Sequence, residues 1–103
     1  MQFTGGLRIG NSLWRAGNYT WPFVLFTIEP DAVTLSKIIF IPETFRFDKA
    51  QITKLSEYRG LFWRGIRIEH SVEGCPPFIV FWTFDLPSVK AELVWNGYEF
   101  SGS

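Results

Sequence analysis

The feature that most constrains the fold of this 103-residue chain is the order of patterns between residues 65 and 97. Ile66 and Ile68 alternate with charged residues, which is the period of a strand with one buried face. After a turn rich in glycine and proline, residues 78–84 form a nearly continuous apolar run that is typical of a central strand. Helical spacing follows. The stretch therefore predicts strand, turn, strand and one closing helix.

Both ends of this final helix carry terminal signals. Asp85 stands where an N-cap is needed, and Gly97 stands at the C′ position, which favours a left-handed residue. We expect the helix to cover a sheet formed by the upstream residues. Its buried stripe is predicted to consist of Leu86, Val89, Leu93 and Val94.

A hairpin is the clearest local prediction upstream of residue 65. Phe23–Glu29 and Val33–Ile41 are rich in strand formers, and they flank a turn with Pro30 at its favoured second position. Four apolar residues share one face of the second strand: Val33, Leu35, Ile39 and Ile41.

The first part of the chain has a less regular pattern. We expect residues 1–6 and 99–103 to be frayed termini. Leu7 and Ile9 predict a first strand that is interrupted at Gly10 and resumes at Leu13 and Trp14, and residues 17–22 are expected to form a loop.

Residues 44–58 leave an alternative open. Phe45–Asp48 alternates as a strand does, whereas Asp48 and Gln51 have the spacing of a capping box and indicate a helical turn. We favour a strand over residues 50–58 with a bulge near Lys49, because the flanking segments are strands.

Composition limits the classes of function. The net charge is zero, so nucleic acid is not an expected partner. One cysteine excludes an internal disulfide, and one histidine beside it argues against a structural zinc site. The start of the chain lacks the pattern of a signal peptide, and no apolar run reaches the roughly 20 residues of a membrane span. We expect a single cytoplasmic domain over residues 1–103.

About seven strands followed by one helix predict a mainly β fold, an antiparallel barrel or sandwich with a C-terminal α-helix. This order resembles the pleckstrin-homology-like (PH-like) superfold, particularly the small bacterial PH-like and GRAM-like domains. The resemblance implies a binding or assembly module without enzymatic activity or cofactor. The residues that carry it are Phe45–Phe47, Ile52, Leu55, Gly65–Ile68, Phe78–Phe81 and Leu86–Gly97 with Tyr98. The first hairpin loop lacks the lysine and arginine cluster of the lipid-binding members, which disfavours phosphoinositide binding.

Two groupings of reactive side chains are explained without a catalytic or metal-binding role. Cys75 and His70 lie near one hairpin tip, yet a turn cysteine and a strand-end histidine explain both residues without catalysis. Glu69, His70 and Glu73 do not form a metal site, because successive strand residues face opposite sides. We therefore assign no catalytic, cofactor-binding or metal-ligating residue.

Residues 44–68 contain six basic and two acidic residues, with aromatic residues among them. Arginine, tryptophan and tyrosine are the usual hot-spot residues of protein interfaces. We therefore predict a non-enzymatic module that binds a protein partner or a second copy of itself. The predicted contact residues are Tyr58, Arg59, Leu61, Phe62, Trp63, Arg64 and Arg67.

Three other interpretations of the same stretch stay open. The aromatic and basic residues also suit an anionic lipid surface, which makes peripheral membrane association the first alternative. The second is a small-ligand-binding barrel or an enzyme that uses Cys75 and His70. The third is structural: Phe62 and Trp63 complete the core while the arginines form a solvated face. Alternation also places Arg64 inward unless Gly65 bulges and resets the register.

Overall fold

The structure is a computed structural model that describes residues 1–11, 16–38, 42–60 and 64–100. Within these residues it confirms the predicted class, a mainly β fold with seven antiparallel strands and a C-terminal helix. The elements are β1 (Gln2–Gly10), β2 (Ala16–Ile28), β3 (Ala32–Lys37), β4 (Glu43–Asp48), the 3₁₀ turn η1 (Lys49–Gln51), β5 (Ile52–Arg59), β6 (Arg64–His70), β7 (Phe78–Thr83) and α1 (Leu86–Trp95).

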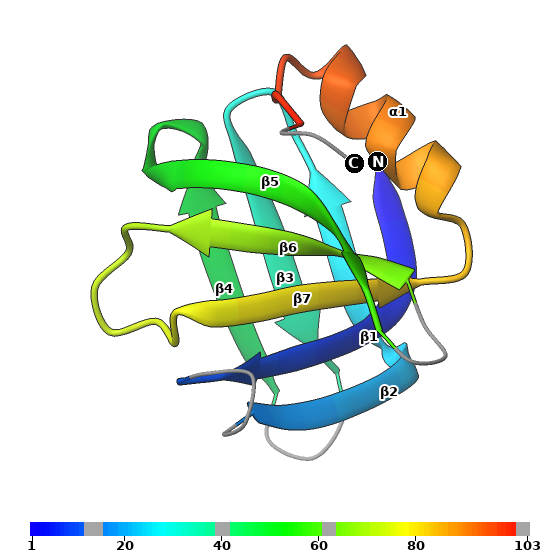
Figure 1. Ribbon diagram of the computed structural model, residues 1–103, viewed down its shortest axis with the longest axis vertical. Helices are drawn as coiled ribbons and strands as arrows, with labels where there is room; N and C mark the ends of the chain where they lie inside the picture. Colours follow the sequence, from blue (N-terminus) through cyan, green and yellow to red (C-terminus); the bar gives the residue numbers. More distant parts are fainter. Residues whose placement is uncertain (12–15, 39–41, 61–63, 101–103) are drawn as a thin grey trace.

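The strands form one continuous sheet in the order β4-β3-β2-β1-β7-β6-β5. Figure 1 shows β5, β6 and β7 crossing in front of β3 and β4, so the sheet curls into a half-barrel with two facing layers. Apolar side chains from both layers fill the space between them. They include Phe26, Leu35 and Phe47 from one layer and Ile66, Ile68, Ile79 and Phe81 from the other.

Strand β1 joins the two layers because it lies between β2 and β7. It pairs with β2 through residues 2–5 and again through residues 7–10, and its residues 6–10 also pair with β7 on the other side. Across the step from Gly5 to Leu7 the register on β2 jumps from Val24 to Tyr19. A Cβ atom at Gly5 would overlap the carbonyl oxygen of Trp82, so this close approach requires glycine.

Two expectations for the first part of the chain are wrong. Residues 2–6 do not fray, because their backbone pairs with β2 and, at Gly6, with β7. Residues 17–22 belong to β2 rather than to a loop, and Pro22 lies in the stretch between Tyr19 and Val24 where the register on β1 shifts. The predicted continuation at Leu13 and Trp14 lies outside the described residues.

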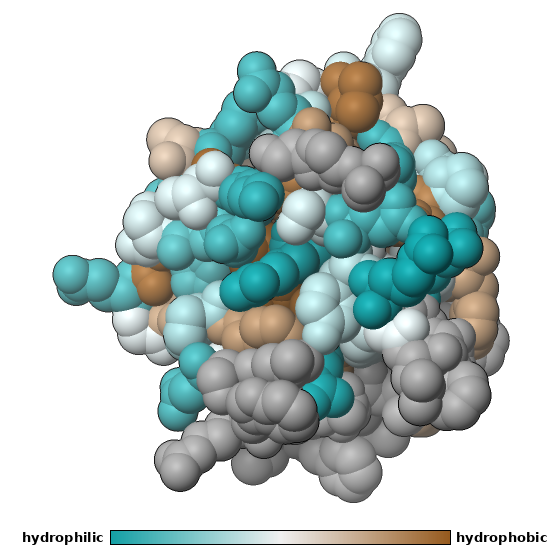
Figure 2. Space-filling view, viewed as in Figure 1, coloured by the Kyte–Doolittle hydropathy of each residue, from teal (hydrophilic) through white to brown (hydrophobic). Residues whose placement is uncertain are grey.

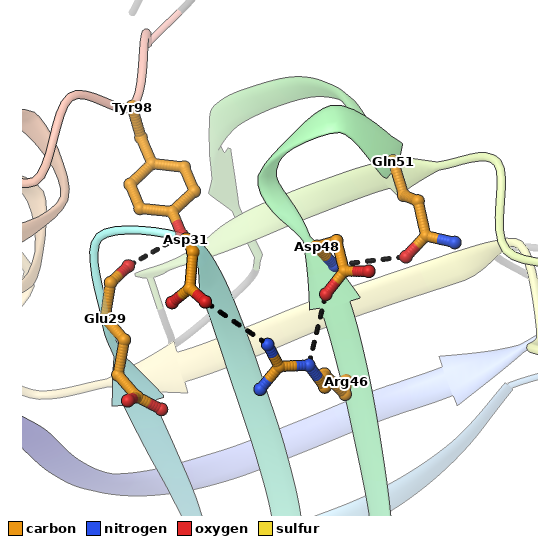
Figure 3. Close-up of polar contacts among 6 residues, drawn as sticks. All are labelled: Glu29, Asp31, Arg46, Asp48, Gln51 and Tyr98. Atoms are coloured by element: carbon orange, nitrogen blue, oxygen red, sulfur yellow. Dashed lines mark hydrogen bonds and ion pairs between the residues drawn. The ribbon is translucent and has the colours of Figure 1, made fainter.

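The predicted hairpin is confirmed as the β2–β3 pair, in which Ile28 lies opposite Val33. Ile39 and Ile41 lie outside the described residues. Both patterns predicted within residues 44–58 are present, one after the other. Residues 49–51 form a helical turn, and a strand follows from Ile52. The side-chain Oε1 of Gln51 accepts a hydrogen bond from the Asp48 backbone N–H at 3.1 Å, as Figure 3 shows. The bulge lies one turn later than predicted, between Ile52 and Lys54.

Helix α1 forms where the sequence predicts it. Gly97 has a φ of +85°, and the N–H groups of Gly97 and Tyr98 donate to the carbonyls of Val94 and Leu93, both at 3.0 Å. This is the Schellman arrangement that ends a helix. Leu86, Val89 and Leu93 are buried as expected.

Two details of the helix differ from the prediction. Val94 is 59% exposed rather than buried, because it lies beyond the edge of the stripe that faces the sheet. Asp85 occupies the N-cap position without a capping hydrogen bond from its side chain. Its backbone N–H instead donates to the hydroxyl of Thr83 at 3.0 Å.

Two contacts hold the C-terminal end of α1 across the end of the half-barrel. The Nζ of Lys49 donates to the carbonyl of Asn96 at 2.6 Å, at the end of the helix where cations are favoured. The hydroxyl of Tyr98 donates to the carbonyl of Glu29 at 2.8 Å (Figure 3). These contacts fix which side of α1 faces the core and which side faces solvent.

Candidate interaction surface

The structure divides the predicted contact residues of the β5–β6 hairpin between two faces. Side chains alternate along a strand, and Leu55 and Ile66 point into the core. Tyr58 and Arg67 therefore lie on the outer face of the sheet. Arg59 and Arg64 lie on the opposite side, toward α1; Leu61, Phe62 and Trp63 lie outside the described residues.

The register question at Gly65 is answered without a bulge. Around Gly65, strand β6 stays in register with both neighbours, and Gly65 lies opposite Tyr58 on one side and Trp82 on the other. A Cβ atom at Gly65 would overlap the carbonyl oxygen of Phe81, so the residue permits a close approach of β6 and β7. Arg64 does follow the inward alternation, and it remains exposed because it lies at the end of the strand.

The outer face carries a closed aromatic cluster. Tyr58 contacts Phe78 and Trp82 edge-on, with ring centroids 5.9 and 5.6 Å apart. The Arg67 guanidinium lies 5.2 Å from the centre of the Phe78 ring, and Phe78 is only 5% exposed. Figure 2, which views this face, shows hydrophilic residues over its centre. Here the half-buried Arg67 covers aromatic surface.

A different arrangement lies at the end of the sheet beside α1. Arg59 and Arg64 are directly opposite each other, both exposed, and neither forms an ion pair with another described residue. Like charges in directly opposed positions destabilise a sheet. Next to them is an open hollow of about 630 Å³, lined by Glu57, Arg64, Thr83, Phe84, Leu86, Pro87 and Lys90. Lys90 and Glu57 form an ion pair across it at 3.6 Å.

The exposed residues of helix α1 are uncharged: Pro87, Ser88, Ala91, Val94 and Trp95. Trp95 is 86% exposed, and Phe84 just before the helix is 67% exposed. Figure 2 shows hydrophobic side chains at the surface over α1. We call this surface the α1 face, and it consists of Phe84, Pro87, Ser88, Ala91, Val94 and Trp95.

The α1 face was not among the residues predicted from the sequence. A signal was present, because the ten residues of α1 contain only two charged residues, Lys90 and Glu92. A surface helix normally has a polar side opposite its buried stripe. A helix that is apolar on both sides therefore indicates that its outer side also makes contacts.

The surroundings of the two helix ends differ in charge. Around Tyr98, at the C-terminal end, burial raises the pKa of the hydroxyl to about 12, and the carboxylates of Asp31, Glu29 and Asp48 outweigh the effect of Arg46. Arg46 itself lies between two of these carboxylates, 3.6 Å from Asp31 and 3.1 Å from Asp48 (Figure 3). The three carboxylates near the C-terminal end of α1 thus outnumber Arg46 and Lys49, whereas Arg59 and Arg64 lie near its N-terminal end.

His70 and Cys75 do not have the geometry of a base and a nucleophile. The Nδ1 of His70 accepts the backbone N–H of Val72 at 3.1 Å, so the Nε2 carries the proton and donates to the carbonyl of Pro76 at 3.0 Å. Burial, and then the nearby Glu43, raise the pKa of the Cys75 thiol. A reactive cysteine needs the opposite shift. The histidine therefore acts as a brace within the turn between β6 and β7.

Two other kinds of feature, a metal site and a membrane-spanning helix, are absent from the described part of the chain. No three acidic, histidine or cysteine side chains gather there in a way that could hold a metal ion. Over the same residues, no helix is long and apolar enough to span a membrane.

Comparisons of the chain with protein-family models, with curated proteins and with solved structures found no match.

Proposed function

We propose that this protein is a non-enzymatic, PH-like binding or scaffolding module of the cytoplasm that acts through protein–protein contacts. The observation that carries the proposal is the α1 face, where Trp95 and Phe84 are among the most exposed large apolar side chains of the described residues. Contiguous exposed apolar surface with a polar rim marks association sites. Arg59 and Arg64 supply such a rim at one end.

Two of the contact residues predicted from the sequence, Arg59 at the end of β5 and Arg64 at the start of β6, contribute to this surface. Arg59 and Arg64 face the side of α1, so a partner that covers Trp95 and Phe84 reaches both arginines. Tyr58 and Arg67 lie on the other face and pack with Phe78 and Trp82, which favours a structural role for them. The proposed mechanism is apolar anchoring by the helix with steering by the two arginines.

The test is carried out in the cells that naturally contain the protein. Each variant of the chain carries a photo-crosslinking amino acid at one position. We expect irradiation to yield a covalent protein adduct with the probe at Trp95. The matched control is Ile38, a large apolar residue that is 52% exposed at the end of β3. Adducts at neither position, or equally at both, would contradict the proposal.

Peripheral association with an anionic membrane is a second candidate. It is favoured by the position of Arg59 and Arg64, which form no ion pair within the described ranges, beside the exposed Phe84, since aromatic rings and cations share the headgroup region. Cosedimentation with phosphatidylserine vesicles and with phosphatidylcholine vesicles separates it from the first. Binding to the anionic vesicles alone, lost at high salt and in Arg64→Glu, would favour the membrane candidate.

A further inference from the structure

The α1 face has large side chains at its ends and small ones between them. Phe84 precedes the helix and Trp95 ends it, whereas Ser88 and Ala91 lie between them on the exposed side. In an antiparallel pair of helices centred between Ser88 and Ala91, Phe84 of each copy lies opposite Trp95 of the other. The small residues let the two backbones approach each other. The face is therefore complementary to itself, as a two-fold interface requires.

The exposed area is sufficient for a specific dimer. From the exposed fractions of Trp95, Phe84 and Val94, these three side chains present roughly 450 Å² per chain. A two-fold interface removes this area from both copies. With Pro87, Ser88 and Ala91 included, the total exceeds the roughly 1,000 Å² that a specific interface needs.

The charges at the two ends favour the antiparallel orientation. Near the N-terminal end of α1, the exposed Arg59 and Arg64 outnumber the exposed Asp85, and none of the three forms an ion pair with another residue that the structure describes. At the C-terminal end, the four carboxylates of Glu29, Asp31, Asp48 and Glu99 outnumber the two cations, Arg46 and Lys49. An antiparallel pair brings opposite charges together twice, and a parallel pair would oppose like charges. The zero net charge of the chain removes general repulsion between copies.

We propose that the α1 face binds the same face of a second copy of this chain, with the two helices antiparallel about a two-fold axis. The inference rests on the proposed protein-binding function and names its partner. The dimer covers Trp95 and Phe84, and it places Arg64 of each copy near Glu99 of the other.

Pairing of sheet edges would give a different dimer, and the exposed residues of the edge strands disfavour it. The edge strand β4 carries Glu43, Arg46 and Asp48, all exposed, and charged residues on an edge oppose the addition of another strand. At the other edge, β5 carries Lys54 and Arg59 in exposed positions. The helix therefore offers the better surface for self-association.

The first test is sedimentation equilibrium of the purified chain over a dilution series. We expect a reversible dimer for the wild type and a dissociation constant at least about tenfold higher for Trp95→Glu. The control Ile38→Glu places the same charge on an exposed apolar residue elsewhere and should leave the constant unchanged. Circular dichroism checks that each variant is folded.

The second test is a charge exchange that only the antiparallel dimer predicts. Arg64→Glu and Glu99→Arg should each weaken the dimer by about threefold or more. The double variant restores both pairs, so its dissociation constant should return to within about twofold of the wild type.

The outcomes separate this inference from the proposed function. A monomer at every concentration, with an adduct at position 95 that contains another protein, would overturn the dimer and leave the binding function standing. A dimer indifferent to Trp95→Glu would overturn the two-fold helix interface. Absence of both the dimer and the adduct would overturn both proposals.

Discussion

At the scale of the residue, Tyr98 couples the closing helix to the β2–β3 turn. Its ring is almost fully buried, and its hydroxyl reaches the carbonyl of Glu29. An ionised phenolate there would lose that donated hydrogen bond and would face the carboxylates of Asp31, Glu29 and Asp48. The folded state therefore holds the neutral form of Tyr98.

The raised pKa of Tyr98 predicts a loss of stability at alkaline pH. Between pH 10 and about pH 12 the unfolded chain releases this proton while the folded chain keeps it, so the free energy of unfolding falls as pH rises. The full decrease is about 2–3 kcal/mol. Urea unfolding of the wild type and Tyr98→Phe from pH 9 to 12 measures it. The stability advantage of the wild type should shrink over this range, and a constant difference would contradict the assignment.

Gly5 predicts a steric effect on stability. Because a Cβ atom would overlap backbone atoms of β7, Gly5→Ala should reduce the free energy of unfolding by about 3 kcal/mol or more. Gly17→Ala is the matched control, since a Cβ atom there meets nothing within 4 Å and should change stability by less than about 0.5 kcal/mol. Equal costs in urea unfolding would show that the close approach is not the cause.

At the scale of the element, α1 is determined by its ends more than by an amphipathic pattern. Gly97 supplies the left-handed residue of the Schellman turn, and Lys49 binds the terminal carbonyl of Asn96 while lying 4.6 Å from the centre of the Tyr98 ring. A cation at this position interacts favourably with the negative, C-terminal end of the helix dipole.

Removal of the Lys49 charge should therefore loosen α1. We expect Lys49→Met to lower the free energy of unfolding by about 1–2 kcal/mol, through the lost hydrogen bond and the lost contact with the aromatic ring. Lys54→Met, at an exposed position on the neighbouring strand, should change it by less than about 0.5 kcal/mol. Thermal unfolding followed by circular dichroism compares the two variants, and equal losses would argue against the anchor.

The elements that the sequence predicts well are those with periodic side chains. The alternation of Ile66 and Ile68 and the cap at Gly97 specify β6 and the end of α1 locally. Strand β1 was missed in part because Gly5 and Gly6 have no side chain to show a period, and their pairing depends on β7, far along the chain. The candidate surface was missed in part for a similar reason. Spacing in α1 identifies the buried stripe but not where its edge lies, which left Val94 on the wrong side.

At the scale of the whole molecule, the half-barrel brings the exposed arginines and the start of the α1 face together at one end. The start of β6, the end of β7 and the start of α1 meet there, since Arg64 pairs with Thr83 and lines the hollow with Pro87. A surface built from three segments is created by folding, and no short stretch of sequence contains it. That is why the sequence identified two of its arginines and not its apolar part.

The position of β1 between β2 and β7 also sets the time course of folding. Gly6 must meet Trp82, so the central pairing of the sheet joins distant segments of the chain. Such pairing carries a large loop-closure entropy, and domains dominated by it fold in milliseconds to seconds rather than microseconds. During synthesis, the edge of β1 that pairs with β7 stays unpaired until β7 leaves the ribosome. Until then the nascent chain exposes a strand edge, which makes this interval its period of greatest risk for aggregation.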